Sequence, residues 1–247
     1  MAEMISDISR KTERITVDGH ELIVSLPHGY SNENARYSIV YMLDGDVLKD
    51  VIASFAAKFD FPIVIVGIVP QDRMAQYTPW PAAALRSGDS GFGGEGDEYL
   101  RSIDETLIPY ICTKFNVSPL PQHTALLGYS LGGLLSLYSL YRTESFGAVA
   151  SVSGSLWYAD WTEFVTNNTV RNTAVQIYIS SGMDEGHGAK GIIRNAAAAT
   201  VQTFDVLRAQ YPDGAILLEW NKHSHHKQIE LKVHTALSRL SKAIREV

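Results

Sequence analysis

The sequence has a single cysteine, Cys112, in 247 residues, so it holds no pair that could form an internal disulfide. It also lacks a basic excess, since 27 Asp and Glu against 21 Lys and Arg give a net charge of -6. Phosphate backbones require a basic face, so this balance argues against a nucleic-acid partner. The longest apolar run, residues 61–69, is too short to span a bilayer, and the first ten residues hold no secretory-type apolar segment. We therefore expect a cytoplasmic protein with no membrane partner.

Apolar residues make up 45% of the chain and charged residues 19%, which suits a large core without bulk disorder. One α/β domain can reach 247 residues, so we predict a single domain over residues 1–247. Short apolar runs typical of buried strands alternate with helical patterns. After an N-terminal hairpin, the runs predicted to be strands are residues 37–43, 61–69, 124–127, 146–151, 175–180 and 216–220.

The predicted hairpin consists of residues 14–17 and 20–26, joined by the turn signal Asp18-Gly19. Helical crossovers between the later strands make neighbouring strands parallel. We therefore predict an α/β fold with a mostly parallel central sheet, an N-terminal antiparallel hairpin and helices on both faces. The helical patterns cover residues 47–59, 97–114, 134–140 and 192–210, and a closing helix whose apolar face is Val233, Leu237, Leu240 and Ile244.

Residues 71–96 show no regular pattern and include a glycine-rich segment. So long a connection inside a compact domain is usually functional, and we expect a mobile loop here. Residues 91–96 formally match the dinucleotide pattern Gly-x-Gly-x-x-Gly, but no strand precedes them and acidic residues such as Glu95 and Asp97 surround them. Because these charges would repel a pyrophosphate, we predict no dinucleotide cofactor.

Residues 128–133 read GYSLGG and stand between a predicted strand and a predicted helix. This is the Gly-x-Ser-x-Gly pattern of a nucleophile elbow, in which the serine occupies a sharp strand-to-helix turn. The flanking glycines avoid clashes in a strained backbone. Ser130 is therefore the candidate nucleophile, and the backbone N–H of Leu131, at the helix N-terminus, can face a developing oxyanion.

A serine nucleophile needs a base to take its proton and a carboxylate to orient that base. The candidates for these roles each follow a later predicted strand, and they are Asp184, Glu185, His223, His225 and His226. The order serine, acid, histidine is that of doubly wound hydrolases. Histidines this close together could also bind a metal, but no second His or Cys cluster supplies further ligands, so we expect none.

Four segments carry a family resemblance: YMLDGD at residues 41–46, GYSLGG at 128–133, SGSLW at 153–157, and EWN at 219–221 with a histidine nearby. They resemble the esterase D-related putative esterase family of the α/β-hydrolase superfamily, which includes ferric-siderophore trilactone esterases and antigen 85 acyltransferases. The resemblance extends from residue 16 to the end of the chain. It implies the α/β-hydrolase fold and a site that needs no cofactor.

The resemblance also distinguishes among the acid and base candidates. A Gly-x-x-Glu pattern after the later strand favours Glu185 over Asp184 as the acid. Relatives with the Glu-Trp-Asn motif tend to have Gly-Asn-His where this chain has His-Ser-His, which favours His225 as the base. The departure at His223 keeps His226 in reserve.

Three further residues are expected near the reacting ester. In similar enzymes the residue after the Asp-Gly pair supplies an oxyanion N–H, which points to Asp46 beside Leu131. Arg73 lies in an Arg-x-x-x-Tyr-x-Pro segment that is near the active site of such esterases, and it could bind an anionic or catecholate group or only order its loop. Trp157 follows a predicted strand, at the edge where open α/β sheets bind ligands, and could form a substrate wall or pack under a loop.

These features predict a serine esterase that hydrolyses a small-molecule carboxylic ester through an acyl-enzyme. The resemblance alone suggests a siderophore ester, such as a catecholate trilactone. Two alternatives are acyl transfer to an alcohol other than water, through the same residues, and a non-catalytic binding protein that keeps the hydrolase scaffold. The sequence does not indicate the oligomeric state.

Overall fold

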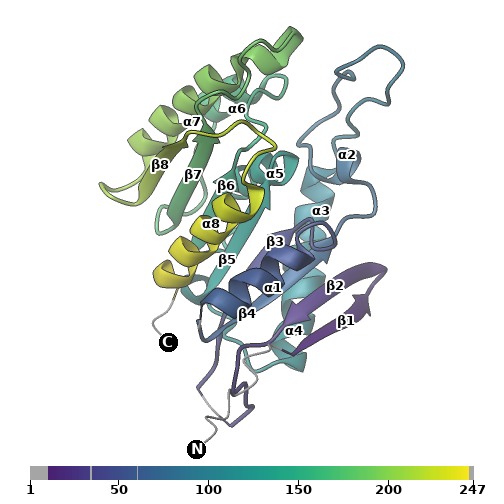
Figure 1. The fold of residues 1–247 in the computed structure, drawn as a ribbon, viewed down its shortest axis with the longest axis vertical. Helices are drawn as coiled ribbons and strands as arrows, with labels where there is room; N and C mark the ends of the chain where they lie inside the picture. Colours follow the sequence, from purple (N-terminus) through teal and green to yellow (C-terminus); the bar gives the residue numbers. More distant parts are fainter. Residues whose placement is uncertain (1–10, 34, 60, 245–247) are drawn as a thin grey trace, which may run out of the picture.

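The computed structural model describes residues 11–33, 35–59 and 61–244 (Figure 1). Its centre is one sheet of eight strands in the order β1-β2-β4-β3-β5-β6-β7-β8. The strands β1 and β2 run antiparallel to each other, β2 runs antiparallel to β4, and all other neighbours are parallel. Their bounds are Thr12–Val17 (β1), His20–Ser25 (β2), Ser38–Leu43 (β3), Ile63–Val69 (β4), Thr124–Tyr129 (β5), Ala148–Val152 (β6), Gln176–Gly182 (β7) and Ile216–Asn221 (β8). This arrangement confirms the predicted α/β-hydrolase class.

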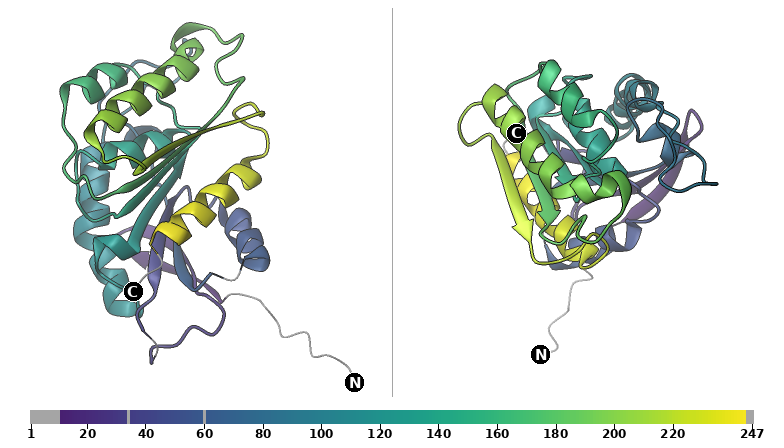
Figure 2. Two further views of the ribbon diagram at one scale, coloured as in Figure 1. Left: turned by 90° about the vertical axis from the view of Figure 1, so that its left-hand side faces the viewer. Right: turned by 90° about the horizontal axis from the view of Figure 1, so that it is seen from above.

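Helices cover both faces of the sheet (Figure 2). The first face carries α1 (Lys49–Lys58) and α8 (Ile229–Ala243), whose apolar side chains share one core cluster. The second core cluster, on the other face, includes side chains from α3 (Gly96–Ser102), α4 (Ile108–Lys114), α5 (Leu131–Ser139), α6 (Trp161–Asn167) and α7 (Ala196–Gln210). None of the described helices is both long enough and apolar enough to cross a bilayer.

The residues of β3 explain why the central strands are apolar throughout. Ile39, Tyr41 and Leu43 belong to one core cluster, whereas Val40 and Met42 belong to the other. Successive side chains of a strand point to opposite faces, so a strand covered on both sides must be apolar at every position. In the hairpin that precedes it, Asp18 and Gly19 have φ of 46° and 79°. These positive values are what a type I′ turn requires, as the sequence predicts.

Three predicted elements differ from the structure in detail. The helix expected over residues 97–114 is α3, a π-helical turn at Ile103–Leu107 and α4. Pro109 has no N–H to donate and its ring would crowd the carbonyl four residues earlier, and the π turn, in which Ile108 N–H bonds Ile103 O, relieves this conflict. The helix expected from residue 192 starts as a 3-10 turn, Gly191–Asn195. Residues 71–96, predicted to be irregular, contain the short helix α2 (Arg73–Gln76).

The rest of that segment is held against the loop that follows β6. Ala82 and Phe92 form an antiparallel bridge, and the Phe92 ring lies edge-on to Tyr158 with 5.2 Å between centroids. The Trp80 indole N–H donates to Ala159 O at 3.0 Å. The tip, residues 85–90, is exposed and projects beyond α2 (Figure 1).

Candidate active site

The turn between β5 and α5 places Ser130 in a strained conformation, with φ 59° and ψ −120°. Its backbone N–H bonds Val152 O on the adjacent strand at 3.0 Å. A Cβ at Gly128 would lie 2.1 Å from Gly132 O, which no side chain could tolerate. The elbow glycine is therefore required by close backbone approach, and the structure has the sharp turn that the Gly-x-Ser-x-Gly pattern predicts.

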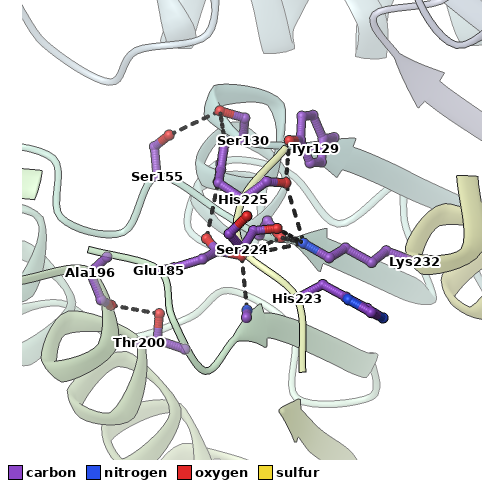
Figure 3. Close-up of polar contacts among 12 residues, drawn as sticks. Tyr129, Ser130, Ser155, Glu185, Ala196, Thr200, His223, Ser224, His225 and Lys232 are labelled. Atoms are coloured by element: carbon purple, nitrogen blue, oxygen red, sulfur yellow. Dashed lines mark hydrogen bonds and ion pairs between the residues drawn. The ribbon is translucent and has the colours of Figure 1, made fainter. Parts of the chain in front are cut away.

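Three side chains from separate strand ends meet at this turn (Figure 3). His225, after β8, has Nε2 3.0 Å from Ser130 Oγ and Nδ1 3.0 Å from an oxygen of Glu185, which follows β7. A carboxylate can only accept, so Nδ1 carries the proton and Nε2 is free to accept from the Ser130 hydroxyl. The chain thus brings together a hydroxyl, a base and an acid in the geometry of nucleophilic catalysis.

Glu185 is 7% exposed, and its second oxygen, Oε1, is also bonded. This oxygen accepts from the Ser153 hydroxyl at 2.6 Å and from the Gly182 N–H at 2.8 Å. Burial alone would raise the pKa of Glu185, but the hydrogen bonds from His225, Ser153 and Gly182 outweigh it and hold the pKa below its ordinary value. The lowered pKa favours the ionised carboxylate that faces His225.

The other candidates for acid and base point elsewhere. Asp184 is exposed. His223 has its ring turned away from Glu185 (Figure 3). His226 is exposed and lies edge-on to the His225 ring, with centroids 4.8 Å apart. Within the part of the chain that the structure describes, no three His, Cys, Asp or Glu side chains are grouped to hold a metal ion.

The candidate oxyanion donors lie on two neighbouring turns. Leu131 is the first residue of α5, and the first N–H groups of a helix have no partner within it. Asp46 follows the turn at Asp44 and Gly45, in which Asp44 N–H donates to the buried Tyr77 hydroxyl at 2.8 Å and Gly45 N–H to Ile68 O. The side chain of Asp44 reaches α5, since a Cβ at Gly132 would be 3.6 Å from its Oδ2.

The Arg73 side chain is hydrogen-bonded to the turn that contains Asp44. Its Nε and Nη2 bond the two carboxylate oxygens of Asp44 at 2.7 and 2.9 Å, and Nη2 also donates to Tyr129 O at 3.2 Å. Burial raises the pKa of Asp44, and the guanidinium opposes that rise. These contacts favour the structural role of Arg73 over substrate binding, because the guanidinium ties its loop to Asp44 and to the Tyr129 carbonyl beside the elbow.

We expect Arg73→Lys to lower kcat by the same factor for neutral and anionic esters, up to about 10²-fold, because lysine keeps the charge but not the two-pronged contact. The measurement is kcat and KM for p-nitrophenyl esters with neutral and carboxylated acyl groups. A rise in KM confined to the anionic ester would instead assign Arg73 to substrate binding.

Trp157 is half-buried and packs against the larger core cluster, two residues after Ser155. Ser155, which the sequence analysis missed, is 1% exposed and its hydroxyl lies 3.3 Å from Ser130 Oγ. Its N–H also bonds Ser130 O at 2.9 Å. Small polar residues directly after a parallel strand are the signal that could have identified it.

Comparisons with known proteins find a matching family model and a related protein. The family model described as "Putative esterase" matches residues 17–212, which contain Ser130 and Glu185 and end before His225. The chain is 33% identical over 211 residues to the uncharacterized protein YbbA of Bacillus subtilis (strain 168), covering 82% of this chain and 84% of that protein.

Two solved structures have a similar fold at lower identity. An IroE-like serine hydrolase from Shewanella oneidensis superposes with a TM-score of 0.75 at 22% identity, covering 96% of this chain and 80% of that one. The siderophore hydrolase EstA from Aspergillus nidulans gives a TM-score of 0.71 at 19% identity, covering 98% and 97%. At these identities the likeness concerns the fold.

Proposed function

The chain belongs to the putative esterase family, and from this premise we propose that it is a serine hydrolase that cleaves a carboxylic ester through an acyl-enzyme. The observation that carries the proposal is the pair of 3.0 Å contacts that His225 makes, one to Ser130 and one to Glu185.

In the first half of the proposed reaction, Ser130 Oγ gives its proton to His225 Nε2 and attacks the ester carbonyl carbon. The carbonyl π electrons move to oxygen, and the N–H groups of Leu131 and Asp46 stabilise this oxyanion. The imidazolium, balanced by Glu185, then returns its proton to the leaving alkoxide as the ester C–O bond breaks. The products of this half are an alcohol and an acyl group on Ser130.

In the second half, His225 takes a proton from water, and the resulting hydroxide equivalent attacks the acyl carbon. The tetrahedral intermediate collapses, the bond to Ser130 Oγ breaks, and the imidazolium restores the serine hydroxyl. Every proton passes through His225 Nε2. No external cofactor is required for this balance.

For the substrate we propose an ester of a siderophore, such as a catecholate trilactone. The support is the resemblance of the sequence motifs and the naming of EstA, which shares the fold, as a siderophore hydrolase. Fold alone does not fix substrate, so this part of the proposal depends on direct assay.

The test compares kcat/KM for a short p-nitrophenyl ester with kcat/KM for iron-free and iron-loaded catecholate trilactones, with Ser130→Ala as the blank. We expect the trilactone to be preferred by several decades, because interactions with the remote parts of a true substrate are used in its transition state. Cleavage of the small ester alone would contradict the proposal of a siderophore substrate but would support the proposal of a serine esterase. Formation of a new ester with an added alcohol, in preference to free acid, would favour acyl transfer.

A further inference from the structure

A buried lysine stands behind the acid and the base. Lys232, on α8, is 5% exposed, and its Nζ reaches the loop that carries His225 (Figure 3). It donates to Ser224 O at 2.9 Å and to His225 O at 3.3 Å. It also donates to Ser153 Oγ at 3.1 Å, and it lies 3.6 Å from Oε1 of Glu185.

These partners require the charged form of the lysine. Ser224 and His225 offer carbonyl oxygens, which only accept. Ser153 gives its own hydroxyl proton to Glu185 at 2.6 Å, so it too accepts from Nζ. Three acceptors need three N–H donors, which an ammonium has and a neutral amine lacks. Burial lowers the pKa of Lys232, and the Glu185 carboxylate opposes this.

We propose that Lys232 is a positioning residue for His225: its ammonium holds the backbone of Ser224 and His225 and, through the Ser153 hydroxyl, the carboxylate of Glu185. This inference rests on the proposed function of the same site. The histidine loop is thereby tied to α8 and to the ends of β6 and β7.

The hydrogen bonds of Lys232 restrict both where the histidine loop lies and how it is oriented. Two consecutive carbonyls on one cation fix both the position and the direction of the loop, because the carbonyl dipoles must point at Nζ. The Tyr129 hydroxyl adds a bond of 2.8 Å to the same His225 carbonyl. A ring held this way keeps Nε2 near Ser130 Oγ, where small displacements are costly for nucleophilic attack.

The titratable groups beside Lys232 lie on the turn after β7 and on the histidine loop. Glu185 faces it from the turn after β7 and His225 from the loop itself, and the Tyr129 hydroxyl, at the end of β5, donates to the same His225 carbonyl. The ammonium approaches Oε1 of Glu185 at 3.6 Å, whereas His225 contacts Oε2, so the lysine and the imidazole face different oxygens of the carboxylate.

The test uses Lys232→Met, which keeps the length and volume of the side chain and removes the ammonium. Its matched control is Lys242→Met, an exposed lysine at the end of the same helix. The readouts are kcat and KM for a p-nitrophenyl ester, and the downfield proton resonance of the His225 Nδ1–H bond to Glu185. We expect kcat to fall about ten- to a hundredfold with KM nearly unchanged, because only the reacting geometry is lost.

The same variant should broaden or lose the downfield resonance, whereas Lys242→Met should match the wild type in both readouts. Retention of that resonance with kcat near the wild-type value would overturn the proposal. If Lys232→Met does not fold, Lys232→Gln, which keeps two N–H donors but removes the charge and leaves the Ser153 bond to Glu185, decides in the same way by a weakened resonance and a lower kcat. The resonance is independent of turnover, so a wild type that hydrolyses no ester would contradict the proposed function and leave this readout decisive for Lys232.

Discussion

Replacing Ser130 with alanine is expected to remove ester turnover almost completely, by on the order of 10⁶ in kcat, while the protein stays folded. The hydroxyl is the group that His225 Nε2 contacts at 3.0 Å, and alanine has no group there that could attack the ester. Alanine has the same Cβ as serine, so the strained turn at φ 59° is retained. The measurement is hydrolysis of a p-nitrophenyl ester, with folding followed by circular dichroism.

The matched control is Ser155→Ala, which removes the neighbouring hydroxyl at 3.3 Å and leaves the nucleophile. We expect this variant to retain most of its turnover, because Ser155 takes no proton in the proposed reaction. Wild-type-like turnover by Ser130→Ala would refute the mechanism. A loss of the same size in Ser155→Ala would show that the two hydroxyls act together.

Glu185→Gln is expected to lower kcat by on the order of 10⁴, because an amide N–H facing His225 Nδ1 reverses the tautomer and places a proton on the nitrogen that must accept. The variant should also be less stable, by about 3–5 kcal/mol in the free energy of unfolding, since Lys232 would lose its buried counter-charge. The measurements are kcat/KM and denaturant unfolding of the wild type and of Glu185→Gln.

Asp184→Asn is the matched control for Glu185→Gln. Asp184 precedes Glu185 in the chain but is exposed, and we expect its replacement to change stability by no more than about 0.5 kcal/mol. A greater loss of kcat/KM or of stability in Asp184→Asn than in Glu185→Gln would reverse the assignment of the acid.

The lowered pKa of Glu185 also makes the stability of the protein depend on pH. The contribution of this carboxylate to the free energy of unfolding is complete above the ordinary glutamate pKa, and it is lost as the pH falls through the lower pKa of the folded state.

The centre of the sheet could be predicted because β3, β4, β5 and β6 are buried along nearly their whole length, which makes them continuous apolar runs. The apolar face of the closing helix could also be predicted from its spacing, and its four residues are at most 2% exposed: Val233, Leu237, Leu240 and Ile244. The sequence did not predict the π-helical turn or the helix α6. The first depends on how Pro109 fits into a buried helix, and the second is a short helix whose burial of Trp161 depends on tertiary packing.

The site was predictable to the extent that strand ends reveal it. Ser130, Glu185 and His225 each follow a strand, and the structure places them within hydrogen-bonding distance of one another in sequence order. Lys232 gave no such signal, because a lysine beside an apolar helical stripe normally extends its charge into water. Only the fold shows that acceptors from two other segments surround its ammonium.

Covalent labelling tests most directly whether Ser130 is an activated nucleophile. The folded protein is exposed briefly to a fluorophosphonate, its intact mass is measured, and the modified peptide is then sequenced. We expect one adduct per chain, on Ser130, and far slower labelling in His225→Ala, because the hydroxyl then has no base to take its proton. A folded wild-type protein that remains unlabelled, or one labelled at another residue, would contradict this role of Ser130.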